Sequence, residues 1–255
     1  MTTAVGAARR GTSAGAVLQV FYRVPRAGAV RLSDGGGPLG FDITAALQID
    51  HLIGAYDCDG IVETGCFVGD STEYFARRYP HLPVRTCDID ADATAVASHR
   101  LADLTNVTVE TGDSAQLLPQ LLSGLSRPLV YLDAHWYSSW PLARELHTVT
   151  RGLIVVDDFD IGHPRFGYDA YDQVVCGPQL VADARADLDR MWVGNPYADY
   201  PLPCLQTGRR AGRGFLTVGL PPGPLDDSPM FTPIPLRPVV MPDWSAVEAL
   251  GKERR

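Results

Sequence analysis

The sequence predicts an α/β fold in which a doubly wound, mostly parallel sheet carries helices on both faces. Short apolar segments rich in β-branched residues alternate with segments of helical periodicity between about residues 60 and 157. The first of these, at Ile61 and Val62, breaks into a turn from Gly65 to Gly69 and then into a helix start. Each predicted parallel strand ends at or just before an acidic residue, namely Glu63, Asp88, Asp113, Asp133 and Asp157. A ligand is expected beyond the carboxyl ends of such strands.

Residues 1–41 form an N-terminal extension rich in Gly, Ala and Arg, which we expect to be partly disordered or to cover the ligand. Within it, Val17 to Val24 suits a short strand. From Asp42 the apolar residues recur at near-helical spacing, so a helix of about twelve residues should lead into the first strand and lie over the cofactor. After the glycine turn, Ser71 and Thr72 are expected to cap a helix that runs to about Tyr79.

The central region 42–220 continues as a strand–helix repeat. Further strands are predicted at 84–88, 107–111, 129–133 and 153–157, with helices at 91–101, 115–122 and 141–148. An irregular insert follows Asp158, then a helix from Gln179 to Arg190 and two strands, 191–194 and 214–219, suited to an antiparallel pair. The tail 221–255 is rich in proline, with a short helix from Trp244 to Leu250, and is predicted to lie as an extended strap on the surface or on a partner subunit.

Composition narrows the classes of partner. The net charge of -8 and pI near 5.2 argue against a protein that binds a nucleic-acid backbone. No apolar run reaches about 18 residues, so neither export nor a membrane span is predicted. Five cysteines without a C-x-x-C pair indicate neither a disulfide frame nor a zinc site. We therefore expect a cytoplasmic protein that acts on a small molecule, with a homodimer left open.

The glycine turn is suited to a cofactor other than a dinucleotide. Gly65 and Gly69 are spaced as G-x-x-x-G, whereas a pyrophosphate loop requires G-x-G-x-x-G. The carboxylate of Glu63 would repel phosphates and could hold the amine of an amino-acid-like cofactor. A purely structural strand–turn–helix is the alternative.

Residues 61–72 resemble the first motif of class I S-adenosylmethionine (SAM) dependent methyltransferases. The resemblance, which extends over about residues 42–220, implies a Rossmann-like sheet of seven strands, five of them parallel and closed by an antiparallel pair. It also implies SAM as the cofactor. The residues expected to bind SAM are Glu63, Gly65, Cys66, Phe67, Gly69, Ser71, Thr72, Asp88, Ile89, Asp113, Ser114 and Asp133.

Two of these carboxylates have competing interpretations. Asp88, at the end of the second strand, can accept both ribose hydroxyls, while Asp90 is the rival ribose ligand or an N-cap of the next helix. In the resembled family a carboxylate and a small polar residue lie near the adenine, which matches Asp113 and Ser114. A helix cap is again the alternative for this pair.

Asp133, Asp157 and Asp158 should converge beyond neighbouring strand ends, where a cation or protons must offset their repulsion. Oxygen ligands of this kind suit Mg²⁺. The pattern resembles the metal-dependent O-methyltransferases that act on sugars and natural products in antibiotic pathways, and by that match these three aspartates are the metal ligands. The alternative is a metal-free acid–base pair of Asp133 and His135.

His135 is the predicted catalytic base, because an imidazole can take a proton from a substrate hydroxyl as the methyl group arrives. A ligating or structural histidine remains an alternative. Trp136, Tyr137 and Trp140 would wall the substrate pocket or pack in the core. The acceptor would be recognised by a lid-like insert that contains His163, Arg165, Phe166, Tyr168, Asp169 and Tyr171.

These residues together predict a SAM-dependent O-methyltransferase of a small hydroxylated metabolite or sugar, with Mg²⁺ as an open addition. One alternative is an atypical SAM-binding enzyme that cyclises SAM or rearranges a substrate without methyl transfer. A nicotinamide-dependent oxidoreductase is the other, because the same sheet topology can host it.

Overall fold

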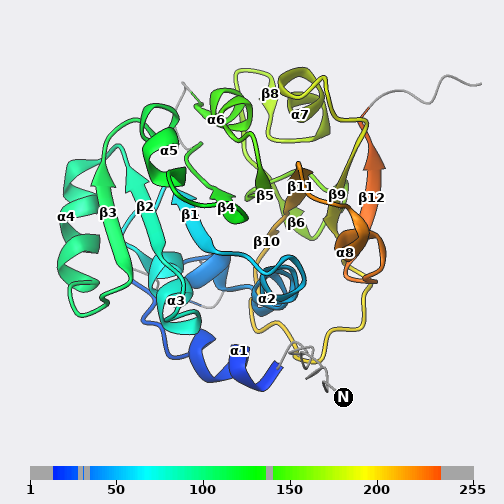
Figure 1. The fold of residues 1–255 in the computed structure, drawn as a ribbon. Coiled ribbons are helices and arrows are strands. Elements are labelled where there is room, and N and C mark those ends of the chain that lie inside the picture. The colour runs from blue at the N-terminus through cyan, green and yellow to red at the C-terminus, as the bar shows by residue number, and fades with distance from the viewer. Residues whose placement is uncertain (1–13, 28–30, 32–34, 136–139, 237–255) are drawn as a thin grey trace, which may run out of the picture.

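A computed structural model describes residues 14–27, 31, 35–135 and 140–236 of the chain. Its centre is an eight-stranded sheet of order β12-β9-β11-β5-β4-β1-β2-β3 (Figure 1). The parallel part consists of β1 (Gly60–Thr64), β2 (Val84–Asp88), β3 (Val107–Thr111), β4 (Pro128–Leu132) and β5 (Gly152–Val156). The predicted parallel strands are therefore confirmed to within one or two residues at their ends.

The antiparallel part of the sheet has one strand more than expected. β11 (Gly214–Val218) pairs with β5 and with β9 (Arg190–Gly194), as the sequence indicated. β12 (Phe231–Pro235) then pairs with β9 as an eighth, edge strand, so the prediction of an extended strap is wrong for this part of the tail. Proline is tolerated at such an edge because only one side of the strand has a hydrogen-bonding partner. The helix predicted at 244–250 lies outside the described residues.

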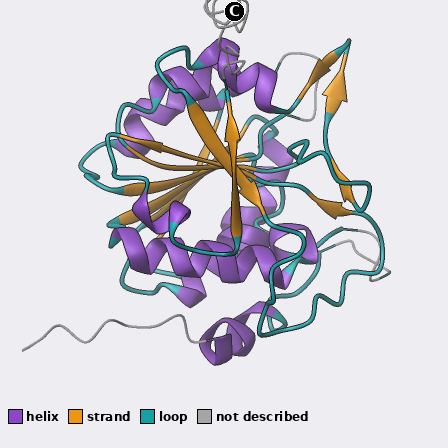
Figure 2. Cartoon of the chain, turned by 90° about the vertical axis from the view of Figure 1, so that its right-hand side faces the viewer, coloured by secondary structure: helices purple, strands orange, loops and turns teal. Residues whose placement is uncertain are grey.

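Helices cover both faces of the sheet (Figures 1 and 2). One face carries α1 (Ala14–Phe21), α2 (Ile43–Tyr56), α3 (Asp70–Arg78) and α8 (Gly223–Asp226), and the other carries α5 (Ser114–Leu122), α6 (Leu142–Thr148) and α7 (Pro178–Ala184). α4 (Ala91–Arg100) packs on β2 and β3. In β4, Leu129 and Tyr131 belong to the first core while Val130 and Leu132 belong to the second. This alternation, with every residue of β4 buried, is typical of a strand between two helical layers.

The N-terminal segment is helical where a strand was predicted. Val17 and Phe21 lie one turn apart in α1 and are both fully buried, packing with Tyr74 of α3 and Phe41. An apolar stretch this short fits both the two-residue repeat of a strand and the 3.6-residue repeat of a helix. Here packing against α2 and α3 decides the conformation. The short 3₁₀ helix η1 (Pro38–Phe41) then leads to Asp42, whose carboxylate caps the predicted helix α2.

Three further predictions are corrected by the structure. α7 ends at Ala184 and Arg190 begins β9, so the helix predicted to reach Arg190 is shorter. α3 has Gly69 as its N-cap and no side-chain cap. The insert contains the short strands β6 (Phe166–Gly167), β7 (Ala170–Tyr171) and β8 (Val174–Val175). β7 pairs with β8, and β6 pairs with β10 (Arg210–Ala211), which lies in the loop between β9 and β11. Among the described residues, no helix has both the length and the apolar character needed to cross a membrane.

Candidate functional site

A cavity of about 720 Å³ lies at the carboxyl ends of β1 to β5. The five acidic residues at the strand ends, Glu63, Asp88, Asp113, Asp133 and Asp157, all line it. Most of the predicted cofactor residues do so as well, namely Gly65, Cys66, Phe67, Ser71, Ile89 and Ser114. Gly69, Thr72 and His135 are not part of its wall. The α2 helix contributes none of the cavity's lining residues; Ala27, the run Gly35 to Gly37 and Gly40 lie there instead.

Both glycines of the turn after β1 have a positive φ, and a Cβ at either position would meet a neighbouring part of the chain. Gly65 has a φ of +77°, and a Cβ at this position would lie 2.3 Å from the Asp133 carbonyl oxygen. The turn is therefore pressed against the end of β4. Gly69 has a φ of +86° and abuts Leu101 and Ala97 of the neighbouring α4 region. Backbone freedom at both positions lets the chain reverse between β1 and α3 while lining the cavity.

Glu63 is almost fully buried at the end of β1. Its Oε2 accepts hydrogen bonds from the hydroxyls of Thr72 and of Thr86, the latter at 2.8 Å. Burial raises the pKa of this carboxyl to about 7, and the two hydroxyls oppose that rise. The Thr72 hydroxyl therefore donates its hydrogen bond to Glu63 and does not cap α3. Ser71 does not cap it either, because its Oγ accepts the backbone N–H of Leu39 at 2.9 Å.

Asp88 is held by two backbone donors. Its Oδ2 accepts the N–H of Phe67 at 2.7 Å and its Oδ1 accepts the N–H of Asp90 at 3.0 Å. Asp90 in turn caps α4 by accepting from the N–H groups of Asp92 and Ala93, as its alternative interpretation predicted. The Asp88 carboxylate is therefore oriented on the cavity wall with lone pairs left for a ligand.

Two apolar side chains flank this carboxylate on the cavity wall. Ile89 is 64% exposed and Phe67 is 58% exposed, although both are large and hydrophobic. Exposed apolar groups at the rim of a cavity are typical of a binding site for a flat or apolar ligand.

Asp113 and Ser114 lie at the start of α5 on the cavity wall. Asp113 caps α5 by accepting the N–H of Ala115 at 3.0 Å, and it forms an ion pair with Arg144 at 3.1 Å. Both residues, together with Arg144, line the cavity. The helix-cap interpretation is confirmed, and contact with a ligand stays a prediction.

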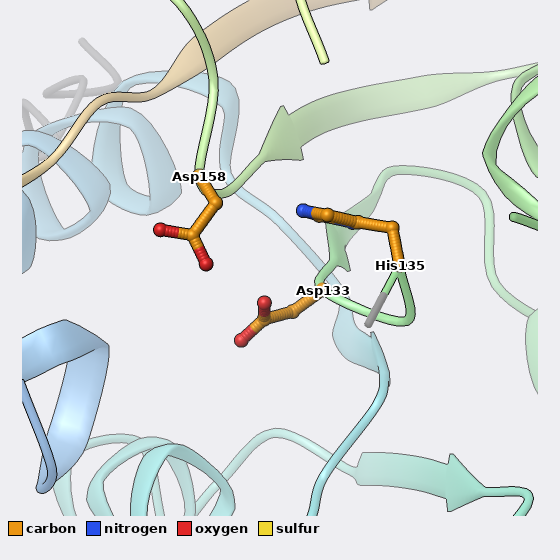
Figure 3. A group of neighbouring side chains, drawn as sticks. All are labelled: Asp133, His135 and Asp158. Atoms are coloured by element: carbon orange, nitrogen blue, oxygen red, sulfur yellow. The ribbon is translucent and has the colours of Figure 1, made fainter. Parts of the chain in front are cut away.

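Asp133, His135 and Asp158 form a compact group beyond β4 and β5. One ligand atom from each lies within 4.8 Å of the others, and Figure 3 shows the two carboxylates and a ring nitrogen facing a common space. Burial, Asp157 and Asp158 raise the pKa of Asp133 well above its usual value. The pKa of Asp158 is raised to about 8 by burial and by Asp157 and Asp169. The group therefore concentrates negative charge that a cation or protons must offset.

Asp157, the third predicted metal ligand, is engaged elsewhere. Its carboxylate pairs with the buried guanidinium of Arg213, with Nη2 3.0 Å from Oδ1, and accepts the Tyr131 hydroxyl. Arg213 also donates to the Leu39 carbonyl at 2.8 Å. The structure thus brings together Asp133 and Asp158 of the predicted set and replaces Asp157 by His135.

His135 is 1% exposed, and neither ring nitrogen has a hydrogen-bond partner among the described residues. Its Nε2 lies 3.8 Å from the Asp169 carboxylate, too far for a hydrogen bond. Burial lowers the pKa of this imidazole, and Asp169 and Asp157 oppose that change. The Trp140 ring meets it edge-on at 5.8 Å and packs on the second core, as the packing alternative predicted, whereas Trp136 and Tyr137 lie outside the described residues.

The sequence did not indicate several residues that shape the site. Arg213 pairs with Asp157 across 56 positions, and Arg100 binds both Asp70 and the Pro25 carbonyl. Asp70 also accepts the N–H of Ala27 at 3.2 Å, which holds the N-terminal segment at the cavity. The glycines 35–37 were recognisable in the sequence as a loop, but no neighbouring residue indicated that they line the cavity. Of the insert residues expected to recognise the acceptor, Asp169 approaches His135, and none lines the cavity.

No protein-family model and no curated protein matches the chain. Among solved structures, the chain is similar to the O-methyltransferase TomG from Streptomyces achromogenes, which is involved in tomaymycin synthesis and was solved in complex with SAM. The identity is 20%, the match covers 80% of this chain and 90% of TomG, and the TM-score is 0.49. It is also similar to an O-methyltransferase from Bacillus cereus in complex with SAH, with 18% identity over 80% and 90% of the two chains and a TM-score of 0.45. Cofactor-bound Rv0187 from MTB matches with 21% identity over 80% and 88% of the two chains and a TM-score of 0.45. All three identities are at most 21% and all three TM-scores are below 0.5, so these similarities do not establish the function of this chain.

Proposed function

We propose that this chain is a SAM-dependent methyltransferase that methylates a hydroxyl of a small metabolite or sugar. The observation that carries the proposal is the acidic cavity at the ends of the parallel strands, in which Asp88 is oriented by two backbone donors beside two exposed apolar side chains. No phosphate group is suited to a wall with a carboxylate at the end of every parallel strand. SAM carries a sulfonium and an amine, both cationic, and such a wall stabilises them.

Three parts of the cofactor, the ribose, the adenine and the amine, have a matching feature in the described residues. The Asp88 oxygens would accept the two ribose hydroxyls, and Phe67 and Ile89 would provide apolar surface for the adenine. Glu63, at the start of the glycine turn, matches the amine. Ala27, which is held by Asp70, and the glycines 35–37 line the cavity beside the turn and would help to exclude water from the bound cofactor.

When bound, SAM supplies a methyl group to a nucleophile placed in line with its sulfur. Asp133 and Asp158, on the same wall, would receive the acceptor hydroxyl. Because burial lowers the pKa of His135, its imidazole is neutral near pH 7 and can accept a proton. In the alternative arrangement, a divalent cation held by these side chains would acidify the hydroxyl and orient it in place of proton transfer to the imidazole. The five cysteines are free, which supports our placement of the enzyme in the reducing cytoplasm.

Calorimetric titration of the purified chain with S-adenosylhomocysteine, SAM and NAD tests the cofactor. We expect the first two to bind and NAD to give no heat, and micromolar NAD binding without S-adenosylhomocysteine binding would contradict the proposal. Mass spectrometry of a panel of sugar and phenolic hydroxyl compounds incubated with SAM then tests the reaction. A gain of one methyl group in an acceptor supports methyl transfer, whereas SAM consumed with no methylated product supports the atypical SAM-binding alternative.

A further inference from the structure

The chemistry of the Asp133, His135 and Asp158 group differs from that of an all-carboxylate site. It offers one imidazole nitrogen and two carboxylates, drawn from the ends of β4 and β5. Figure 3 shows the three side chains directed at one space, and Asp133 and Asp158 also line the cavity. An ion held there would be open to the cavity on one side.

The histidine provides an observation that is independent of the acidic residues. A buried imidazole nitrogen without a hydrogen-bond partner has lost its hydrogen bonds to water and gained none in the protein, which destabilises the fold. His135 is 1% exposed and both its ring nitrogens lack a partner among the described residues, while one nitrogen faces the two carboxylates. A bound cation would satisfy that nitrogen and compensate the cost.

The charges of the neighbouring groups favour a dication. Asp157 is paired with Arg213, whose Nη2 lies 3.0 Å from its Oδ1, so its charge is compensated within the protein. Asp133 and Asp158 have no ion pair with a cationic side chain among the residues that the structure describes. With a cation bound between them, the two carboxylates are ionised and together with a neutral imidazole carry two negative charges, which one divalent cation balances.

We propose that Asp133, His135 and Asp158 bind a divalent first-row transition metal in preference to Mg²⁺. Mg²⁺ selects oxygen ligands, whereas an imidazole nitrogen suits Fe²⁺, Ni²⁺ and Zn²⁺, and Co²⁺ lies between Fe²⁺ and Ni²⁺ in the general order of affinity. Three protein ligands leave coordination positions on the cavity side for water or for an oxygen of the acceptor. The identity of that acceptor oxygen rests on the proposed function, but binding of the metal does not.

Calorimetry of the metal-free full chain with Co²⁺ and with Mg²⁺, together with the visible absorption of the Co²⁺ form, tests the proposal. We expect one Co²⁺ per chain, bound at least about ten-fold more tightly than Mg²⁺. His135→Gln should lower the Co²⁺ affinity by about ten-fold or more, change the Co²⁺ spectrum and leave Mg²⁺ binding almost unchanged. His99→Gln, at an exposed position of α4, is the matched control and should change none of these readouts.

Equal affinities for Co²⁺ and Mg²⁺ in the wild-type chain, or no stoichiometric Co²⁺ binding, would overturn the proposal even if His135→Gln failed to fold. A folded His135→Gln variant with wild-type Co²⁺ affinity and spectrum would do the same. Titration with S-adenosylhomocysteine separates this inference from the proposed function. If S-adenosylhomocysteine binds and the metal does not, only the metal site fails; the reverse result leaves the metal site standing and removes the methyltransferase.

Discussion

Replacing Asp88 by alanine tests the cofactor site most directly, because this carboxylate contributes little to the stability of the folded chain. Its two protein partners are the backbone N–H groups of Phe67 and Asp90, and both hydrogen bonds are exposed to solvent. Water can replace the carboxylate at these donors, so we expect a loss of stability of about 1 kcal/mol or less. The larger effect should fall on the ligand.

The expected loss of affinity follows from the hydrogen bonds that Asp88 would make to the ribose. Charge-assisted hydrogen bonds are worth about 1.5–3 kcal/mol. Asp88→Ala should therefore raise the Kd of S-adenosylhomocysteine by about 10- to 150-fold, since each 1.4 kcal/mol corresponds to a factor of ten. Asp88→Asn keeps one acceptor oxygen and should give an intermediate value. Isothermal titration calorimetry measures both.

Two neighbouring aspartates provide the controls. Asp90→Ala removes the cap of α4 and should cost about 1 kcal/mol of stability while leaving the Kd almost unchanged, because the proposal assigns the ribose to Asp88 and only the helix cap to Asp90. Asp92→Ala, at an exposed position of the same turn, should change neither quantity. An Asp88→Ala affinity within two-fold of wild type, combined with a ten-fold loss in Asp90→Ala, would refute the assignment and move the ribose to Asp90.

The remaining predictions concern stability, measured by chemical denaturation. Arg213→Met should lower the free energy of unfolding by about 3–5 kcal/mol, because Asp157 then stays buried without its cation. Gly65→Ala should cost several kcal/mol, since its Cβ would lie 2.3 Å from the Asp133 oxygen, whereas Gly124→Ala, at a φ of +80° with open space, should cost only about 1–2 kcal/mol of backbone strain. Glu63→Gln should remove a fall in stability of up to roughly 3 kcal/mol as pH rises from about 4.5 to about 7.

The sign of the Glu63 effect follows from its raised pKa. The folded state holds the proton more tightly than the unfolded state, so the carboxyl favours folding below its unfolded pKa and disfavours it once ionised. Parallel pH profiles of the wild type and Glu63→Gln would contradict this reasoning. For the buried ion pair, the double variant Arg213→Met with Asp157→Asn should recover part of the lost stability. Equal costs for Gly65→Ala and Gly124→Ala would contradict the close approach of the turn to β4.

The parallel strands, the glycine turn and the acidic strand ends were determined by local sequence. Buried apolar runs and a turn that needs positive φ are properties of a few consecutive residues, and the parallel order alone carries the strand-end acids to one edge of the sheet. The shared cavity of Glu63, Asp88 and Asp133 was therefore predictable.

The eighth strand and the first helix were decided by tertiary structure. Residues 231–235 contain two prolines and read as an irregular tail, but the free edge of β9 accepts them as a strand. The segment around Val17 and Phe21 suits either a strand or a helix by its sequence. The helix is selected because it buries both side chains against α2 and α3.

Only the tertiary structure decided which aspartate is free to bind an ion. Asp157 and Asp158 are adjacent and chemically identical, and nothing near them in the sequence distinguishes them. Arg213, brought alongside by the antiparallel pairing of β11 with β5, compensates the charge of Asp157. Asp158, at a φ of +44°, is left with Asp133 and His135. Charge compensation depends on distances in space, and these are fixed by strand pairing between segments far apart in the chain.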